Sequence, residues 1–282
     1  MSAVVPAGTP IALPELEQTV TELILELLLI ERENRYPELL YAHPDQKQSV
    51  RITMHYTMAL LAYGFTAQDE ELKRALSWFD KPFPRRQDDW VNVNEMNRLT
   101  VLLHLAPHKE QVQTRLRYLA KQQANGYFDI QPGWQAYDSL WALEAFVLAK
   151  KQGVLSEQLF PMEELRKRLS EILAPHELKR DKDRTLALRM WFDLYGELEP
   201  EHVYMLHDVL EFAGRNHSMW GMREFEWRMA MMQLKWFQAL VEGRRLTYDM
   251  VRDDQRGEED REDNYKFFRK VILSTCMVIE YL

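Results

Sequence analysis

The segment "DSLWALEAFVLA" (138–149), followed by "MEELRKRLSEIL" (162–173), decides the fold class. In the first segment apolar residues occupy nearly every side of a helix. In the second they recur at three- and four-residue spacing opposite a charged face. The first pattern predicts a helix buried on both sides, and the second predicts an outer helix that covers it. Gly153, in the connection, is typical of a helix C-terminus. Together they predict a helical hairpin.

The same hairpin recurs along the chain. When the apolar segments are aligned by their C-terminal ends, equivalent positions lie 42, 43, 47 and 45 residues apart, at Tyr63, Leu105, Leu148, Tyr195 and Leu240. Each apolar segment precedes a charged one; the charged segments are 69–79, 109–122, 162–173, 200–212 and 264–282. A leading helix at about 14–34 precedes the first pair. This internal period predicts an all-α chain of about five to six helical hairpins.

Two architectures share such a period. A closed α/α toroid has a ring of inner helices surrounded by outer helices, and an open HEAT- or armadillo-like solenoid stacks the same hairpins into a superhelix. The spacing leaves both open. In either case we expect an extended or disordered arm at 1–13 and one repeat domain over 14–282. A run of charges at 252–264 predicts a solvated insertion in that domain.

Composition excludes several classes of partner. The net charge of −8 disfavours general binding to nucleic acid or to anionic membranes. Cys276 is the single cysteine, which excludes an intrachain disulfide and fits a reducing compartment. The first residues have no basic segment before their apolar ones, and the apolar run 23–30 is too short to cross a bilayer. We therefore expect a cytoplasmic, soluble protein with no membrane span.

The connection after the second charged segment carries a recognisable pattern. An aromatic–aliphatic pair precedes a Gln, and a Gly follows two residues before an aromatic ring; these residues are Tyr118, Leu119, Gln123, Gly126 and Phe128. Looser copies span 77–90 and 211–221, with Trp90 and Trp220 at the aromatic position. The pattern resembles the QW-like motif of the terpenoid cyclases and protein prenyltransferases and covers about residues 50 to 245. The resemblance implies an α/α toroid whose central cavity holds an apolar, isoprenoid-like ligand.

The catalytic motifs of that superfamily are absent from the amino-acid sequence. A D-x-D-D motif is absent, and "DRED" (260–263) has Glu262 at its third position within a solvated charge run. The overlapping "EDRED" (259–263) has the spacing of a magnesium-binding motif from a different fold, but a second such motif is absent. Cyclase or prenyltransferase chemistry of the well-known kind is therefore disfavoured.

The sequence also lacks the residue spacings that known metal sites require. Cys276 lacks the nearby Asp of the prenyltransferase zinc site, and a buried structural thiol is the better interpretation. Pro107 interrupts the helical spacing of His104 and His108. His202 and His207 are five residues apart, on different helix faces. The sequence predicts no metal site and no cofactor.

The first turns of the inner helices are the candidate site, because they would surround one mouth of a closed toroid. Asp138 and Glu95 are the candidate general acids. The candidate ligand-binding residues, whose aromatic and charged groups suit a cationic or apolar ligand, are His55, Tyr56, Trp134, Tyr137, Arg223, Glu226 and Trp227. Asn94, Asn97 and Arg184 fall at the same turns. The alternative is that the acidic residues only pair locally with Arg98, Arg223 or Arg228, since acidic side chains are favoured at helix starts.

The expected function is that of a terpenoid cyclase- or prenyltransferase-like toroid protein that binds, or transforms, an apolar small molecule. The alternative is a non-catalytic helical scaffold that binds a protein partner. A carbohydrate-active α/α barrel is a third hypothesis, because Glu95, Asp138 and Glu226 could supply two inward carboxylates.

Overall fold

The computed structural model describes residues 10, 12–35, 37, 39–42, 47–81, 93–124, 134–174, 181–215 and 234–247. Within these ranges, the side chains of 47–48, 93–94, 123–124, 134–139, 181–183 and 212–215 are not described. The described residues form helices and one isolated β-bridge between Pro10 and Thr247, which confirms the all-α class for this part of the chain. None of the helices found there has the length and apolar character needed to cross a bilayer.

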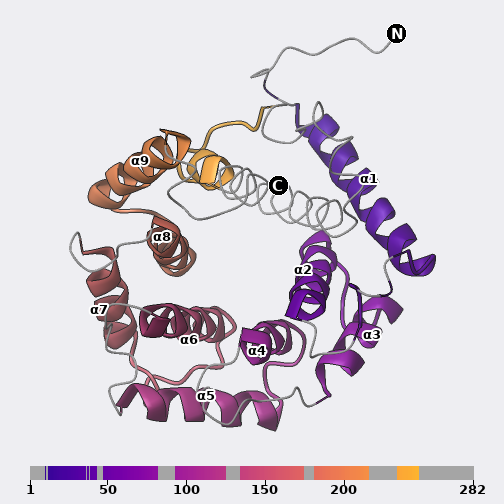
Figure 1. The fold of residues 1–282 in the computed structure, drawn as a ribbon, viewed down its shortest axis with the longest axis horizontal. Helices are drawn as coiled ribbons and strands as arrows, with labels where there is room; N and C mark the ends of the chain where they lie inside the picture. The colour runs from indigo at the N-terminus through magenta and orange to yellow at the C-terminus, as the bar shows by residue number, and fades with distance from the viewer. Residues whose placement is uncertain are drawn as a thin grey trace. The chain divides into compact units, whose positions relative to one another are not determined.

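The helices follow the predicted alternation. They are α1 (Leu13–Arg32), α2 (Lys47–Tyr63), α3 (Glu70–Phe79), α4 (Val93–Leu105), α5 (Glu110–Ala124), α6 (Trp134–Lys151), α7 (Met162–Leu173), α8 (Asp181–Tyr195) and α9 (Pro200–Arg215) (Figure 1). Residues 234–241 are also helical. Each predicted segment in the described ranges overlaps one of these helices. The insertion 252–264, Cys276 and the last charged segment lie outside the described residues.

The chain divides into two compact units. Unit 1 comprises residues 1–75 and 214–282, and unit 2 comprises residues 76–213. The two boundaries fall within α3 and α9. The prediction of a single domain over 14–282, and the choice between a toroid and a solenoid, stay predictions.

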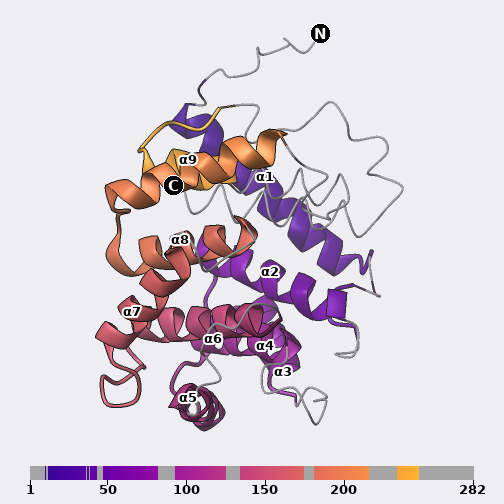
Figure 2. The same cartoon turned by 60° about the vertical axis from the view of Figure 1, so that its left-hand side comes forward.

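Unit 2 is organised around α6. This helix packs against α4 and α8, and the charged helices α5 and α7 lie against these central helices, as Figures 1 and 2 show from two sides. The residues of α6 buried after its first turns cover most of the helix circumference: Leu140, Ala142, Leu143, Ala145, Phe146, Val147 and Ala149. This broad burial explains why apolar residues occupy nearly every side of α6, with the exposed Glu144 on the remaining face.

Helix α7 shows the complementary pattern. It buries Leu165, Leu169, Ile172 and Leu173 on one face and keeps its charged residues on the other. The turn between α6 and α7 is closed by Gly153, whose φ of +67° is accessible to glycine without a side-chain clash. The N–H of Val154 donates to the carbonyl oxygen of Ala149 at 3.0 Å, which satisfies one of the last carbonyls of α6. These features make α6 and α7 the hairpin that the sequence predicts.

In unit 1, α1 packs against α2. Helix α1 buries Leu16, Val20, Ile24, Leu27 and Ile30 along one stripe. Its N-terminus is held by the N–H of Ala12, which donates to the Glu15 carboxylate at 3.4 Å. Since buried leucine and isoleucine side chains each contribute about 1.5–3 kcal/mol, burial of this stripe stabilises α1 in unit 1.

Candidate functional site

Helices α4, α6 and α8 run in the same direction. Nε2 of Gln152, just after α6, lies 3.3 Å from Nδ1 of His104 near the end of α4. Nζ of Lys151, the last residue of α6, lies 3.0 Å from Oδ1 of Asp193 near the end of α8. Both contacts join C-terminal ends of helices that pack side by side. The first turns of the three helices are therefore gathered at the opposite edge of unit 2, which we call the N-terminal edge.

Several predicted site residues fall on this edge. Glu95 lies in the first turn of α4, and Arg184 lies in the first turn of α8. Trp134, Tyr137 and Asp138 lie in the first turns of α6, but their side chains are outside the described part of the structure. Of the grouping that the repeat predicts, the structure describes the side chains of Glu95 and Arg184 only, and the grouping itself stays a prediction.

The remaining candidates lie in unit 1 or outside the described residues. His55 and Tyr56 lie in α2 of unit 1, and Arg223, Glu226 and Trp227 lie outside the described residues. Gly126, Phe128, Trp90 and Trp220 of the QW-like loops, and the side chain of Gln123, also lie outside them.

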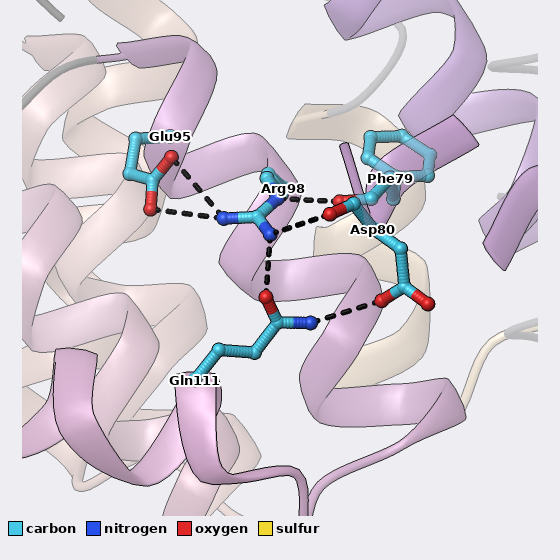
Figure 3. Close-up of polar contacts among 5 residues, drawn as sticks. All are labelled: Phe79, Asp80, Glu95, Arg98 and Gln111. Carbon is cyan, nitrogen blue, oxygen red and sulfur yellow. Dashed lines mark hydrogen bonds and ion pairs between the residues drawn. The ribbon is translucent and has the colours of Figure 1, made fainter. Parts of the chain in front are cut away.

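Glu95 is engaged by Arg98 in a buried network. Nη1 of Arg98 lies 3.2 Å from Oε1 of Glu95, one turn earlier on α4, and both side chains are less than a tenth exposed (Figure 3). This is the local pairing that the alternative interpretation of the acidic residues expects. It favours a structural role for Glu95.

The other donors of Arg98 hold the end of α3. Its Nε donates to the carbonyl oxygen of Phe79, and its Nη2 donates to that of Asp80 at 3.3 Å and to Oε1 of Gln111 at 2.7 Å (Figure 3). Nε2 of Gln111 in turn donates to the Asp80 carboxylate at 2.9 Å. A cation at a helix C-terminus satisfies carbonyls that have no partner within the helix. Arg98 thus joins α3, α4 and α5.

Tyr56 is also committed to packing. It is fully buried, and its hydroxyl donates to Oε2 of Glu31 at 2.6 Å. Oε1 of the same carboxylate accepts from Nη1 of Arg74 at 2.6 Å. Tyr41 meets the Tyr56 ring edge-on, with ring centroids 6.3 Å apart, and its backbone N–H donates to Oγ1 of Thr53 at 3.1 Å. In unit 1, Tyr56 therefore joins α2 to α1.

The environment of both tyrosines opposes their ionisation. Burial raises the pKa of Tyr56 well above its ordinary value, and the hydrogen bond to Glu31 raises it further. Burial likewise raises the pKa of Tyr41, with a second contribution from the negative charge on Glu31. Each hydroxyl keeps its proton, so Tyr56 acts as a hydrogen-bond donor to Glu31.

Glu31 was missed by the sequence reasoning, although a signal was present. Val20, Ile24 and Leu27 occupy successive positions of the buried stripe of α1, and Glu31 occupies the next. Its side chain is 6% exposed. An ionisable residue on an apolar stripe needs partners, and this rule would have identified Glu31 from the sequence.

Asn97 is the second residue whose importance the sequence did not indicate, although it lies in the first turns of α4. It lies two residues after Glu95 and is 9% exposed. Its Nδ2 is buried and has no hydrogen-bond partner in the part of the chain that the structure describes. Asn97, Val101 and His104 share one face of α4, and His104 contacts Gln152 after α6. The amide is therefore on the α6 side of α4, at the N-terminal edge. Buried donors without a partner are uncommon and need an explanation.

Comparisons with profiles of protein families, with curated protein sequences and with solved structures found no match to this chain.

Proposed function

We propose that this protein binds an apolar, isoprenoid-like small molecule that carries a hydrogen-bond acceptor, at the N-terminal edge of α4, α6 and α8. The buried Nδ2 of Asn97 is the observation that carries the proposal. An unmade hydrogen bond in a protein interior costs about 1–3 kcal/mol, and an acceptor on a ligand would recover it. A retained cost of this kind is typical of functional positions.

The surroundings of Asn97 suit a mostly apolar ligand. Met96 and Leu99 in the first turns of α4, and Leu140 in α6, are buried apolar residues of the helices that form this edge. The first turns of α6 add Trp134 and Tyr137 by sequence. Binding sites for small molecules combine an apolar lining with few polar groups that fix orientation. Because Glu95 and Arg98 pair with each other in the same turns, the Asn97 amide is the donor proposed for the hydroxyl or diphosphate end of an isoprenoid.

A binding experiment with a matched pair of variants tests the proposal. The full chain is titrated with farnesol and with farnesyl diphosphate by isothermal calorimetry. Asn97→Leu replaces the amide by an apolar group of similar shape and should weaken binding about tenfold, the equivalent of about 1.4 kcal/mol. It should also raise the free energy of unfolding of the ligand-free protein by about 1 kcal/mol.

The control is Gln113→Leu, which makes the same chemical change on α5, where Gln113 donates to the carbonyl oxygen of Pro107 at 3.2 Å. It should leave the affinity unchanged. Equal binding by wild type and Asn97→Leu would refute the role of the amide. If wild type binds neither compound saturably, the proposed function fails and the scaffold alternative is favoured.

Whether the protein also transforms the bound compound needs its own test. Asp138 is the remaining candidate general acid at this edge, and the test is product formation from the bound compound by wild type and by Asp138→Asn. If wild type forms product and the variant forms it at the same rate, Asp138 is not the acid.

A further inference from the structure

A cluster of metal-ligand types lies where α8 ends and α9 begins. Glu199, Glu201 and His202 each place one ligand atom, a carboxylate oxygen or a ring nitrogen, within 4.8 Å of the others. The turn is fixed by the backbone, because the N–H groups of His202 and Val203 donate to the carbonyl oxygen of Glu199 at 2.9 and 3.1 Å. Pro200 occupies the first position of the helix, where its missing N–H costs nothing. The three side chains therefore start from a rigid helix end.

The acidic residues alone have an ordinary explanation, because helix N-termini favour negative side chains. His202 does not. His202 is only 5% exposed. Its ring packs edge-on against Trp191 of α8, with ring centroids 4.6 Å apart. Its Nδ1 is buried and makes no hydrogen bond within the described ranges. A buried histidine whose Nδ1 has no partner among the described residues, in one cluster with two carboxylates, is the feature that points to a ligand.

We propose that Glu199, Glu201 and His202 bind a divalent metal ion of the zinc type. One imidazole nitrogen and two carboxylate oxygens form a ligand set that Zn²⁺ accepts, and the ion would provide the partner that the histidine nitrogen lacks. Because Glu201 is exposed, water can complete the coordination shell.

The positive charge of Arg166, close to Glu199, is compatible with metal binding at this site. Nη2 of Arg166 lies 3.6 Å from Oε1 of Glu199, a half-exposed pair that holds the carboxylate loosely. The same guanidinium lies 5.9 Å from the Trp191 ring centroid and 6.0 Å from that of Tyr195. Arg166 can therefore keep its contact with these ring faces when Glu199 turns to a metal.

This site goes beyond the proposed ligand-binding function. It lies after the C-terminal end of α8, whereas the ligand is assigned to the N-terminal edge. The sequence predicted no metal site because the spacing considered there was that of two histidines, His202 and His207. The ligand set found in the structure instead pairs His202 with carboxylates one and three residues before it.

Zinc titration of matched variants tests the site. The metal-free full chain is titrated with Zn²⁺ by calorimetry, and the spectrum of added Co²⁺ reports coordination directly. Wild type should bind one equivalent with high affinity. Glu201→Gln removes an exposed carboxylate and His202→Gln keeps a polar side chain of similar size. Each should weaken binding by about 10- to 100-fold, the loss typical even of groups that only support a metal ligand.

Two controls make the same chemical changes nearby. Glu197→Gln alters an exposed carboxylate two residues before the cluster, and His207→Gln alters a histidine further along α9. Both should bind Zn²⁺ like wild type, and the Co²⁺ spectrum should change only in the cluster variants. The proposal is overturned if wild type binds no Zn²⁺, or if Glu201→Gln and His202→Gln bind it as tightly as the controls do. Circular dichroism of each variant confirms that a loss of binding is not a loss of folding.

Discussion

The hydroxyl of Tyr56 donates to the Glu31 carboxylate at 2.6 Å and so joins α2 to the end of α1. Twenty-five residues separate the two in sequence. Because Glu31 is almost fully buried and Tyr56 is fully buried, water cannot replace either partner. Hydrogen bonds to a charged group are among the stronger ones in proteins, and this one lies in the packed interior of unit 1.

Tyr56→Phe should therefore lower the free energy of unfolding by about 1.5–3 kcal/mol, since it removes the donor and leaves the ring. Glu31 keeps Arg74 as a partner, which holds the loss within that range. Urea unfolding followed by circular dichroism measures it. The control is Tyr204→Phe on α9, where the tyrosine is 73% exposed and a change within about 0.5 kcal/mol is expected. Equal effects of the two substitutions would contradict the structural role of the hydroxyl.

Replacing Arg98 should destabilise the protein, even when the new residue is lysine. Its guanidinium serves Glu95, Gln111 and two carbonyl oxygens at the end of α3, and a single ammonium cannot reach all four. Arg98→Lys should lower the free energy of unfolding by about 1–3 kcal/mol, because buried acceptors lose their donor. Arg117→Lys, at an exposed position of α5, is the matched control and should change it by less than about 0.5 kcal/mol. A similar small effect of both would show that the network around Arg98 is dispensable.

Helical periodicity was sufficient for the fold class, and the main difference lies at the start of α2. The apolar segment that ends near Tyr63 belongs to a helix that already begins at Lys47, before the apolar residues dominate. Ser49, Thr53 and Thr57 are fully buried polar residues in this helix. Thr57 satisfies its hydroxyl by donating to the carbonyl oxygen of Thr53 at 2.7 Å, within the helix itself. Such local satisfaction lets polar residues occupy core positions, where a count of apolar residues overlooks them.

The candidate site was predictable only where it depends on local spacing. The pairing of Glu95 with Arg98 follows from their three-residue separation on a helix. The other partners of Arg98 are the carbonyl oxygens of Phe79 and Asp80, and backbone atoms leave no trace in a sequence. Asn97 could be assigned to the first turns of α4, but whether its amide nitrogen finds a partner among the described residues depends on the packing of the neighbouring helices.

His104 should make stability depend on pH between about 4 and 6.5. Burial, helped by the nearby charge of Lys151, lowers the pKa of His104 from its ordinary 6.5 to about 4. The amide nitrogen of Gln152 can only donate, so the Nδ1 that faces it must be an unprotonated acceptor. The folded state thus favours the neutral ring. The resulting stabilisation is present above pH 6.5 and is lost as the pH falls toward 4.

The measurement is the free energy of unfolding in urea at a series of pH values from about 7 down to about 4.5. His104→Gln should flatten the decline on acidification, because the group that must be protonated is gone. His108→Gln, at an exposed position four residues later, should leave the decline as in wild type. If His104→Gln retains the full decline, other groups produce the acid sensitivity.

Gly196 ends α8 in a conformation that restricts its replacement. Its φ is +76°, and its N–H donates to the carbonyl oxygen of Phe192 at 2.8 Å. A Cβ added there would meet no atom within 4 Å, so the cost of a side chain arises from the backbone alone. Gly196→Ala should therefore lower the free energy of unfolding by about 1–2 kcal/mol. Gly196→Asn should cost less, because asparagine adopts the left-handed region more readily than alanine. Thermal unfolding of both variants measures the order. If alanine is tolerated as well as asparagine, the turn can adopt another conformation and Gly196 is not required by its φ angle.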